Sequence, residues 1–150
     1  MKYSKMVKYL ISIVLSIAIY SCGKMQNSPV DSVTIFIKAA EEHDITKAWS
    51  TLSPEAQSYY NDIGEKNRKS GKGILEHDIS EVVKFRNKTD YKITADSSNP
   101  NIVLIIVNGG SAVFRIETVA ENNDYKLKDG NSVRNALNSV AADMVRKDYY

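Results

Sequence analysis

Short strand-forming runs separated by turn signals occupy the second half of the chain, and they constrain the fold more than any other feature. Four such runs are present, at residues 91–96, 102–107, 111–121 and 124–128. Asn108-Gly109-Gly110 stands between the second and third runs, and Asn122-Asn123 stands between the third and fourth. Turns of this kind join antiparallel neighbours in a sheet. The pattern therefore predicts a four-stranded antiparallel meander.

The second run, residues 102–107 (IVLIIV), is uninterrupted aliphatic sequence. Such strands are typical of positions buried on both faces of a sheet, so we expect a central strand covered on both sides. In the third run, Phe114 and Ile116 alternate with Arg115 and Glu117. This alternation predicts one buried face and an exposed face that carries the two charged residues as a surface pair.

Helix signals occupy the first half of the chain. Ser28-Pro29 and Ser53-Pro54 each combine an N-cap serine with a proline at the first helical position, and Asp44 is a third candidate N-cap. Apolar residues recur at intervals of three and four after each of these caps. The sequence therefore predicts three helices, ending near residues 43, 52 and 66.

Three further segments complete the pattern. Residues 64–73 (GEKNRKSGKG) carry four basic residues without P-loop spacing. We expect a solvated loop there, with contact to anionic lipid head groups as the functional alternative. Residues 74–87 fit both a helix face and a strand alternation, and we favour the helix. Residues 131–147 follow an amphipathic pattern that predicts a final helix.

Helices that precede an antiparallel sheet indicate the α+β class. We expect N-terminal helices packed on a curved antiparallel sheet, with a C-terminal helix. The 150 residues suit one domain, and the 43% hydrophobic and 25% charged content excludes wholesale disorder.

The first 21 residues differ from the rest of the chain. Lys2, Lys5 and Lys8 precede residues 9–21, which carry no charge. This apolar run is shorter than the about 20 residues that span a bilayer. A basic segment followed by a short apolar run is typical of a secretory signal. A buried N-terminal helix is the alternative, although the run lacks a polar face.

The only cysteine stands at the end of this run. Ile19-Tyr20-Ser21-Cys22 resembles the lipobox of bacterial lipoproteins: an aliphatic residue, then a small residue directly before the cysteine. Tyr20 stands where the pattern usually has a small or aliphatic residue. The resemblance implies cleavage after Ser21, diacylglycerol on the Cys22 sulfur and acylation of the new amino group, with palmitate as a typical acyl chain.

This resemblance divides the chain into three parts. Residues 1–21 are predicted to be a lipoprotein signal peptide, residues 22–27 a lipidated tether, and residues 28–150 a single α+β domain. The Cys22 anchor makes membrane lipid a predicted partner. The expected location is the cell envelope. Gly23 after the cysteine favours the outer membrane, with the domain periplasmic or surface-facing, if the organism is diderm.

Charge and cysteine content exclude several functions. The whole chain carries +2, but the three signal lysines leave 17 basic against 18 acidic residues, a net charge of −1. That balance excludes nucleic acid as an expected partner. One cysteine forms no internal disulfide and no multi-thiolate site, and the two histidines lack metal-ligand spacing. No metal or cofactor is predicted.

Several landmarks of the region from residue 28 to residue 129 resemble the nuclear transport factor 2-like lipoproteins of unknown function. They are Ser28-Pro29, His43-Asp44, Ala48, Leu52-Ser53-Pro54-Glu55 and the late NNDYKLKD. The resemblance implies a curved sheet that wraps a long first helix and leaves a cone-shaped pocket, used for binding in some members and for catalysis in others. The helix predicted after the last strand departs from that family, whose fold usually ends on a strand.

Three aromatic residues, Trp49, Tyr59 and Tyr60, are the candidate ligand-binding residues because they fall within two adjacent short helices. They could line a pocket or a partner groove. The structural alternative, which we favour, is that Trp49 and one tyrosine complete the core while the other tyrosine is half exposed.

Acid–base chemistry has two candidate groups, His43-Asp44 and Glu76-His77-Asp78. Adjacent residues on a helix point about 100° apart, so neither group forms a dyad through sequence proximity. No catalytic residue is predicted.

The sequence therefore predicts a membrane-anchored envelope lipoprotein that binds a small apolar ligand or an envelope protein without catalysis. One alternative is an accessory or structural subunit of an envelope complex, which requires an exposed apolar patch. The other is a small isomerase-like or dehydratase-like enzyme, which requires a histidine or carboxylate buried in the cone.

Overall fold

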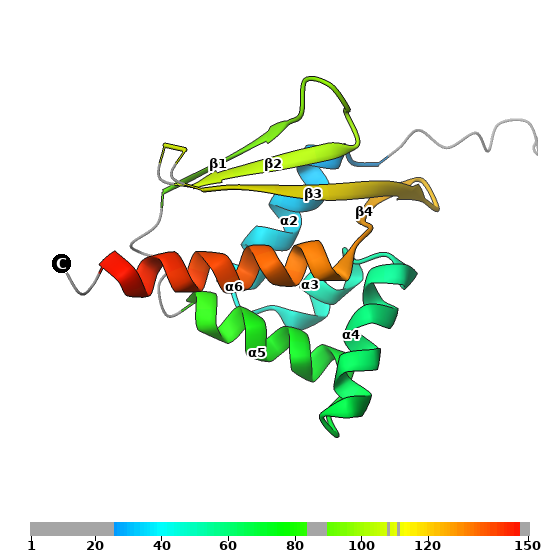
Figure 1. Ribbon diagram of the computed structural model, residues 1–150. Helices are drawn as coiled ribbons and strands as arrows, with labels where there is room; N and C mark the ends of the chain where they lie inside the picture. Colours follow the sequence, from blue (N-terminus) through cyan, green and yellow to red (C-terminus); the bar gives the residue numbers. More distant parts are fainter. Residues whose placement is uncertain (1–25, 84–89, 108, 111, 148–150) are drawn as a thin grey trace, which may run out of the picture.

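The computed structural model describes residues 26–83, 90–107, 109–110 and 112–147. The predicted signal peptide and Cys22 lie outside these residues. Within the described ranges, four helices precede a sheet and one helix follows it (Figure 1). The α+β class and the predicted order of helices and strands are therefore confirmed.

Three of the helices begin where the sequence places their caps. The helices are α2 (Pro29–Glu41), α3 (Ile45–Ser50), α4 (Pro54–Lys66), α5 (Gly71–Val83) and α6 (Gly130–Lys147). Ser28 and Asp31 form a reciprocal capping box at α2, in which each side chain accepts a hydrogen bond from the other residue's backbone N–H. Asp44 and Ser53 cap α3 and α4. Helix α3 ends earlier than predicted because Leu52 forms a parallel bridge with Leu127 of the sheet.

The connection between α4 and α5 is shorter than predicted. The solvated loop that we expected over residues 64–73 is confined to the exposed residues 67–70, because α4 continues through Lys66, where its end was predicted, and α5 begins at Gly71. Glycines permit the close turn: a Cβ on Gly64 would lie 2.6 Å from the Lys69 carbonyl oxygen. Charge and periodicity in the sequence do not predict such close approach of two backbone segments.

Helix α5 settles the ambiguity of residues 74–87 as far as Val83. The favoured helix is confirmed there, and the strand alternative is wrong. Residues 84–87 lie outside the described part of the chain.

The predicted meander is confirmed. Its strands are β1 (Tyr91–Ala95), β2 (Ile102–Val107), β3 (Ala112–Glu121) and β4 (Asp124–Leu127), antiparallel and adjacent in sequence order. Asn122 and Asn123 between β3 and β4 have φ angles of 50° and 67°. Asparagine tolerates this left-handed conformation, which a two-residue hairpin turn of type I′ requires.

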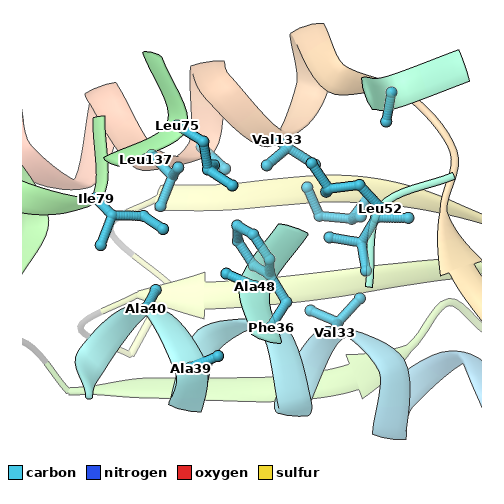
Figure 2. Packing of buried hydrophobic residues seen from close by; sticks show 14 of the residues in the cluster. Val33, Phe36, Ala39, Ala40, Ala48, Leu52, Leu75, Ile79, Val133 and Leu137 are labelled. Carbon is cyan, nitrogen blue, oxygen red and sulfur yellow. The ribbon is translucent and has the colours of Figure 1, made fainter. Parts of the chain in front are cut away.

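The core lies between one face of the sheet and the helices. Helix α2 contacts all four strands, and α6 contacts β3. Figure 2 shows side chains of α2, α5 and α6, among them Phe36, Leu75 and Leu137, converging in this space. None of the helices in the described ranges has the length and apolar content that crossing a membrane requires.

The other face of β2 is not buried as predicted. Val103, Ile105 and Val107 are buried against the helices, whereas Ile102, Leu104 and Ile106 are only partly buried. The prediction of a strand covered on both sides is therefore wrong for one face. The composition of a strand does not show whether helices cover one or both faces of its sheet. Here the helices lie on one side of the sheet (Figure 1).

The chain enters the fold along the edge of β4. The Gln26 N–H donates to the Asn123 carbonyl oxygen at 2.8 Å. The Asn27 side chain donates to the Tyr125 carbonyl oxygen at 3.2 Å and accepts from the Tyr125 N–H at 2.6 Å. Gln26 and Asn27, which we assigned to the tether, thus bond directly to the sheet.

Candidate functional site

The three candidate aromatic residues lie in contact. Trp49 of α3 meets Tyr60 of α4 with ring centroids 6.4 Å apart and ring planes at 63°. Tyr59 meets Tyr60 at 5.8 Å and 88°. Both pairs have the edge-to-face arrangement that aromatic rings favour. Tyr60 is therefore the centre of a row that links α3 to α4.

The burial of the three side chains differs. Tyr60 is 0% exposed, whereas Trp49 and Tyr59 are partly buried at the margin of the core. The Tyr59 hydroxyl donates to Asn131 Oδ1 of α6 at 3.1 Å. The structural alternative holds for Tyr60, which lies in the core, whereas Trp49 and Tyr59 are both only partly buried. Trp49 and Tyr59 retain surface that a ligand could touch, and their role in binding stays a prediction.

Tyr60 carries a polar atom into the core. Its hydroxyl is buried and has no hydrogen-bond partner among the described residues. Burial raises the pKa of Tyr60 above its ordinary value, and the nearby Asp78 carboxylate raises it further. The phenol is therefore neutral at physiological pH.

Asp78 of α5 is the buried acid beside this aromatic row. It is 3% exposed and accepts a hydrogen bond from Arg134 Nε of α6 at 2.9 Å. Burial raises the pKa of Asp78 above its ordinary value, and the Arg134 guanidinium opposes that rise. A perturbed carboxylate beside a phenol is a possible catalytic pair, but the bond to Arg134 makes this one a joint between two helices.

Sequence reasoning missed the pairing of Asp78 with Arg134. We considered Asp78 only as a neighbour of His77, within a run of acid–base candidates. A usable signal was present, because Ile74, Leu75, Asp78 and Ile79 follow helical spacing and all four are buried. An acid at a core position requires a cationic partner, but nothing local identifies Arg134.

The histidines occupy exposed positions. His43 follows α2 with a left-handed φ of 58°, and its Nε2 lies 3.7 Å from Glu76 Oε1. Both members of this pair are about half exposed, and His77 is exposed as well. Neither histidine is buried, whereas the enzyme alternative requires a histidine or a carboxylate buried in the cone.

Packed side chains occupy the region between α2 and the sheet. Phe36 of α2 is 3% exposed, and Ile105 and Ile116 of the facing strands are buried in the same cluster. Leu52 and Leu127 close this cluster beside β4. The described core therefore places side chains where the resemblance implies a cone-shaped pocket.

Metal ligands do not gather in the described ranges: no group of three or more His, Cys, Asp or Glu residues there is arranged to hold an ion. Comparisons of the chain with protein-family models, with curated proteins and with solved structures give no match.

Proposed function

We propose that this chain is a lipid-anchored protein of a bacterial cell envelope whose α+β domain binds a partner without catalysis. The carrying observation is the lipobox-like Ile19-Tyr20-Ser21-Cys22, which places the only cysteine directly after a charge-free run. Two or more acyl chains on such a cysteine hold a protein firmly to a bilayer.

The entry of the chain into the fold supports this proposal. Gln26 already bonds to the β3–β4 hairpin, only four residues after Cys22. An extended chain spans at most about 3.6 Å per residue, so a four-residue connection reaches no further than about 14 Å. A lipid on Cys22 would therefore hold the hairpin end of the sheet close to the bilayer.

The anchor is tested by labelling cells with radioactive palmitate and by fractionating their membranes. The wild-type chain should be labelled and should remain with the membrane fraction. Cys22→Ala should lose both properties, whereas Thr46→Ala, a change at an exposed position of α3, should lose neither. Labelling and retention that persist in Cys22→Ala would overturn the proposed anchor.

Within this proposal, the domain is of the nuclear transport factor 2-like kind. The contact of α2 with every strand of the sheet supports that assignment, and the C-terminal helix α6 remains a departure from it. Trp49 and Tyr59 are the proposed contacts for a small apolar ligand.

Trp49 is the only tryptophan, so its fluorescence reports binding directly. Titration of the full chain in detergent with a naphthalene-based apolar dye should quench this fluorescence saturably. The effect should be lost in Tyr59→Ala and kept in Tyr125→Phe, a change on β4. A titration curve unchanged by Tyr59→Ala would exclude this binding site.

One observation favours the second candidate function, a subunit of an envelope complex. That function requires an exposed apolar patch, and the outer face of the sheet places the exposed Val113 (52%) beside the partly buried Ile106. A subunit role predicts a stable association through this face.

A further inference from the structure

The apolar residues on the outer face of the sheet form a continuous surface across β2 and β3. We define the outer-face patch as Ile102, Leu104, Ile106 and Val113. The three β2 residues alternate with buried neighbours and are only partly buried, while Val113 is 52% exposed. The helices pack against the opposite face (Figure 1).

The strand register sets the layout of this patch. Ile106 stands between Lys92 of β1 and Val113 of β3, and Leu104 stands between Thr94 and Arg115. Ile102 pairs with Glu117 of β3 at the other end of the patch. Leu104 is therefore central, and Lys92 and Glu117 occupy diagonally opposite corners.

Those two corners carry opposite charges. Lys92 is exposed, and no carboxylate of the described residues lies within ion-pair distance of its ammonium group. Glu117 pairs with Lys128 at 2.8 Å, but its side chain is still 50% exposed. A surface with opposite charges at opposite corners is complementary to a second copy of itself.

We propose that the outer-face patch is the interface of a symmetric dimer of this chain, with the two sheets packed face to face. The two-fold axis runs along the line from Val113 through Leu104, so each of these residues meets its counterpart. With strands about 4.8 Å apart and about 3.4 Å per residue, rotation about this line brings Lys92 near Glu117 of the second copy and crosses the strands at about 70°, closer to the orthogonal than to the aligned mode of sheet packing.

The charge pattern favours a second copy over a lipid surface as the occupant. Arg115 beside the patch is held by Asp96 at 2.7 Å, and Glu117 adds a negative charge. A membrane-binding face needs an excess of cations to meet anionic lipid, whereas this face carries both signs.

The size of the patch sets the expected strength of the dimer. It lies on two neighbouring strands about 4.8 Å apart and takes three outward positions along β2 and one on β3. This is smaller than a standard interface of about 800 Å² per partner, so we expect a reversible dimer. The dimer does not depend on the proposed lipid at Cys22.

Site-specific cross-linking tests the axis. The full chain carrying Cys22→Ala and Val113→Cys has one cysteine, placed on the proposed two-fold axis. Because packed sheets lie about 10 Å apart, a short bismaleimide is a better probe than a disulfide. In detergent lysates of whole cells it should give a covalent dimer, whereas Cys22→Ala with Ser58→Cys, at an exposed position of α4, should remain monomeric.

Charge reversal tests the pairing of the corners. Lys92→Glu or Glu117→Lys in the Val113→Cys chain should lower the cross-linked fraction about tenfold, because like charges then face each other. The double change Lys92→Glu with Glu117→Lys should restore the dimer, with circular dichroism confirming the fold of each variant.

Two results would overturn the proposal. One is an absence of cross-linked dimer from Val113→Cys at every protein concentration, including the case in which the protein binds anionic vesicles instead. The other is a double charge reversal that cross-links no better than the single variants. Because all these chains lack Cys22, their behaviour is distinct from success or failure of the proposed anchor.

Discussion

At the scale of single residues, buried polar groups and closely packed glycines control how α4, α5 and α6 meet. Asp78 is buried, and its partner Arg134 is about one third exposed. A pair of this kind adds little net stability, but removal of one partner leaves the other charge uncompensated. The joint therefore acts mainly through the geometry it imposes on α5 and α6.

Asp78 should give the protein a specific dependence of stability on pH. Its pKa is raised in the folded state above the ordinary value of 3.8, so the folded protein binds this proton more readily than the unfolded chain. The resulting stabilisation is fully present below pH 3.8 and is lost as pH rises through the raised pKa. The Asp78→Asn variant has no carboxyl group at this position, so its free energy of unfolding lacks this contribution to the pH dependence.

The free energy of unfolding of the wild type, minus that of Asp78→Asn, should therefore fall as pH rises from about 4 towards neutrality. Urea unfolding at a series of pH values measures this difference. The lowered pKa values of Asp31 and Asp96 act in the opposite direction, but they are common to both proteins and cancel. A difference that increases with pH would contradict the raised pKa.

Two neighbouring glycines at the start of α5 should respond oppositely to alanine. A Cβ on Gly71 would lie 2.8 Å from the Asn61 backbone nitrogen and 2.9 Å from the Trp49 ring, so Gly71→Ala should destabilise by about 1–3 kcal/mol. At Gly73 the nearest atom is Ser70 Oγ at 3.3 Å. Gly73→Ala should therefore be neutral or stabilise by up to about 1 kcal/mol. Thermal unfolding of both variants tests this, and equal effects would refute it.

At the scale of elements, serine N-caps begin both α2 and α4, and the serine of α4 also fastens its helix to the sheet. Ser28 forms a capping box at an exposed helix end, whereas Ser53 is buried. Ser53 Oγ accepts from the Ala56 N–H at 3.1 Å and donates to the Lys128 carbonyl oxygen at 3.0 Å. One side chain thus connects the start of α4 with the end of β4.

Replacing the two serines should separate capping from tertiary attachment. Ser28→Ala should lower the free energy of unfolding by about 1 kcal/mol, the usual value of an N-cap. Ser53→Ala should lower it by about 2–3 kcal/mol, because it also leaves the part-buried Lys128 carbonyl oxygen without this donor. Denaturant unfolding measures both. A Ser53→Ala effect no larger than that of Ser28→Ala would show that the bond to Lys128 contributes nothing.

At the scale of the whole molecule, the bonds of Gln26 and Asn27 to the sheet determine where the N-terminal segment leaves the domain. Asn27 reaches across 98 positions in sequence to form both of its bonds with Tyr125 of β4. These bonds direct the chain along the β4 edge towards the β3–β4 hairpin.

Loss of the Asn27 side chain should free residues 26–27 from the edge of β4. Asn27→Ala removes the acceptor of the Tyr125 N–H, so that amide should exchange with solvent at least about tenfold faster, equivalent to about 1.4 kcal/mol. Asn27→Asp keeps an acceptor oxygen and should preserve most of the protection. Hydrogen exchange followed by mass spectrometry measures it, and equal exchange in the two variants would argue against an anchoring role for Asn27.

Local signals predicted most of the fold. The caps at Ser28, Asp44 and Ser53 are confirmed, as are the four strands and the turn at Asn122-Asn123. The candidate site was predicted less completely. Trp49, Tyr59 and Tyr60 do meet, but the buried pair that accompanies them required knowledge of how α5 and α6 pack.

The sequence by itself determined which elements form and in what order, because capping, turns and periodicity act between residues close in the chain. Only the tertiary structure decided which face of β2 the helices cover, which tyrosine is buried, and that Asp78 meets Arg134 across 56 positions in sequence. These outcomes depend on the close packing of distant segments, where a glycine or a buried charge matters through its neighbours in space.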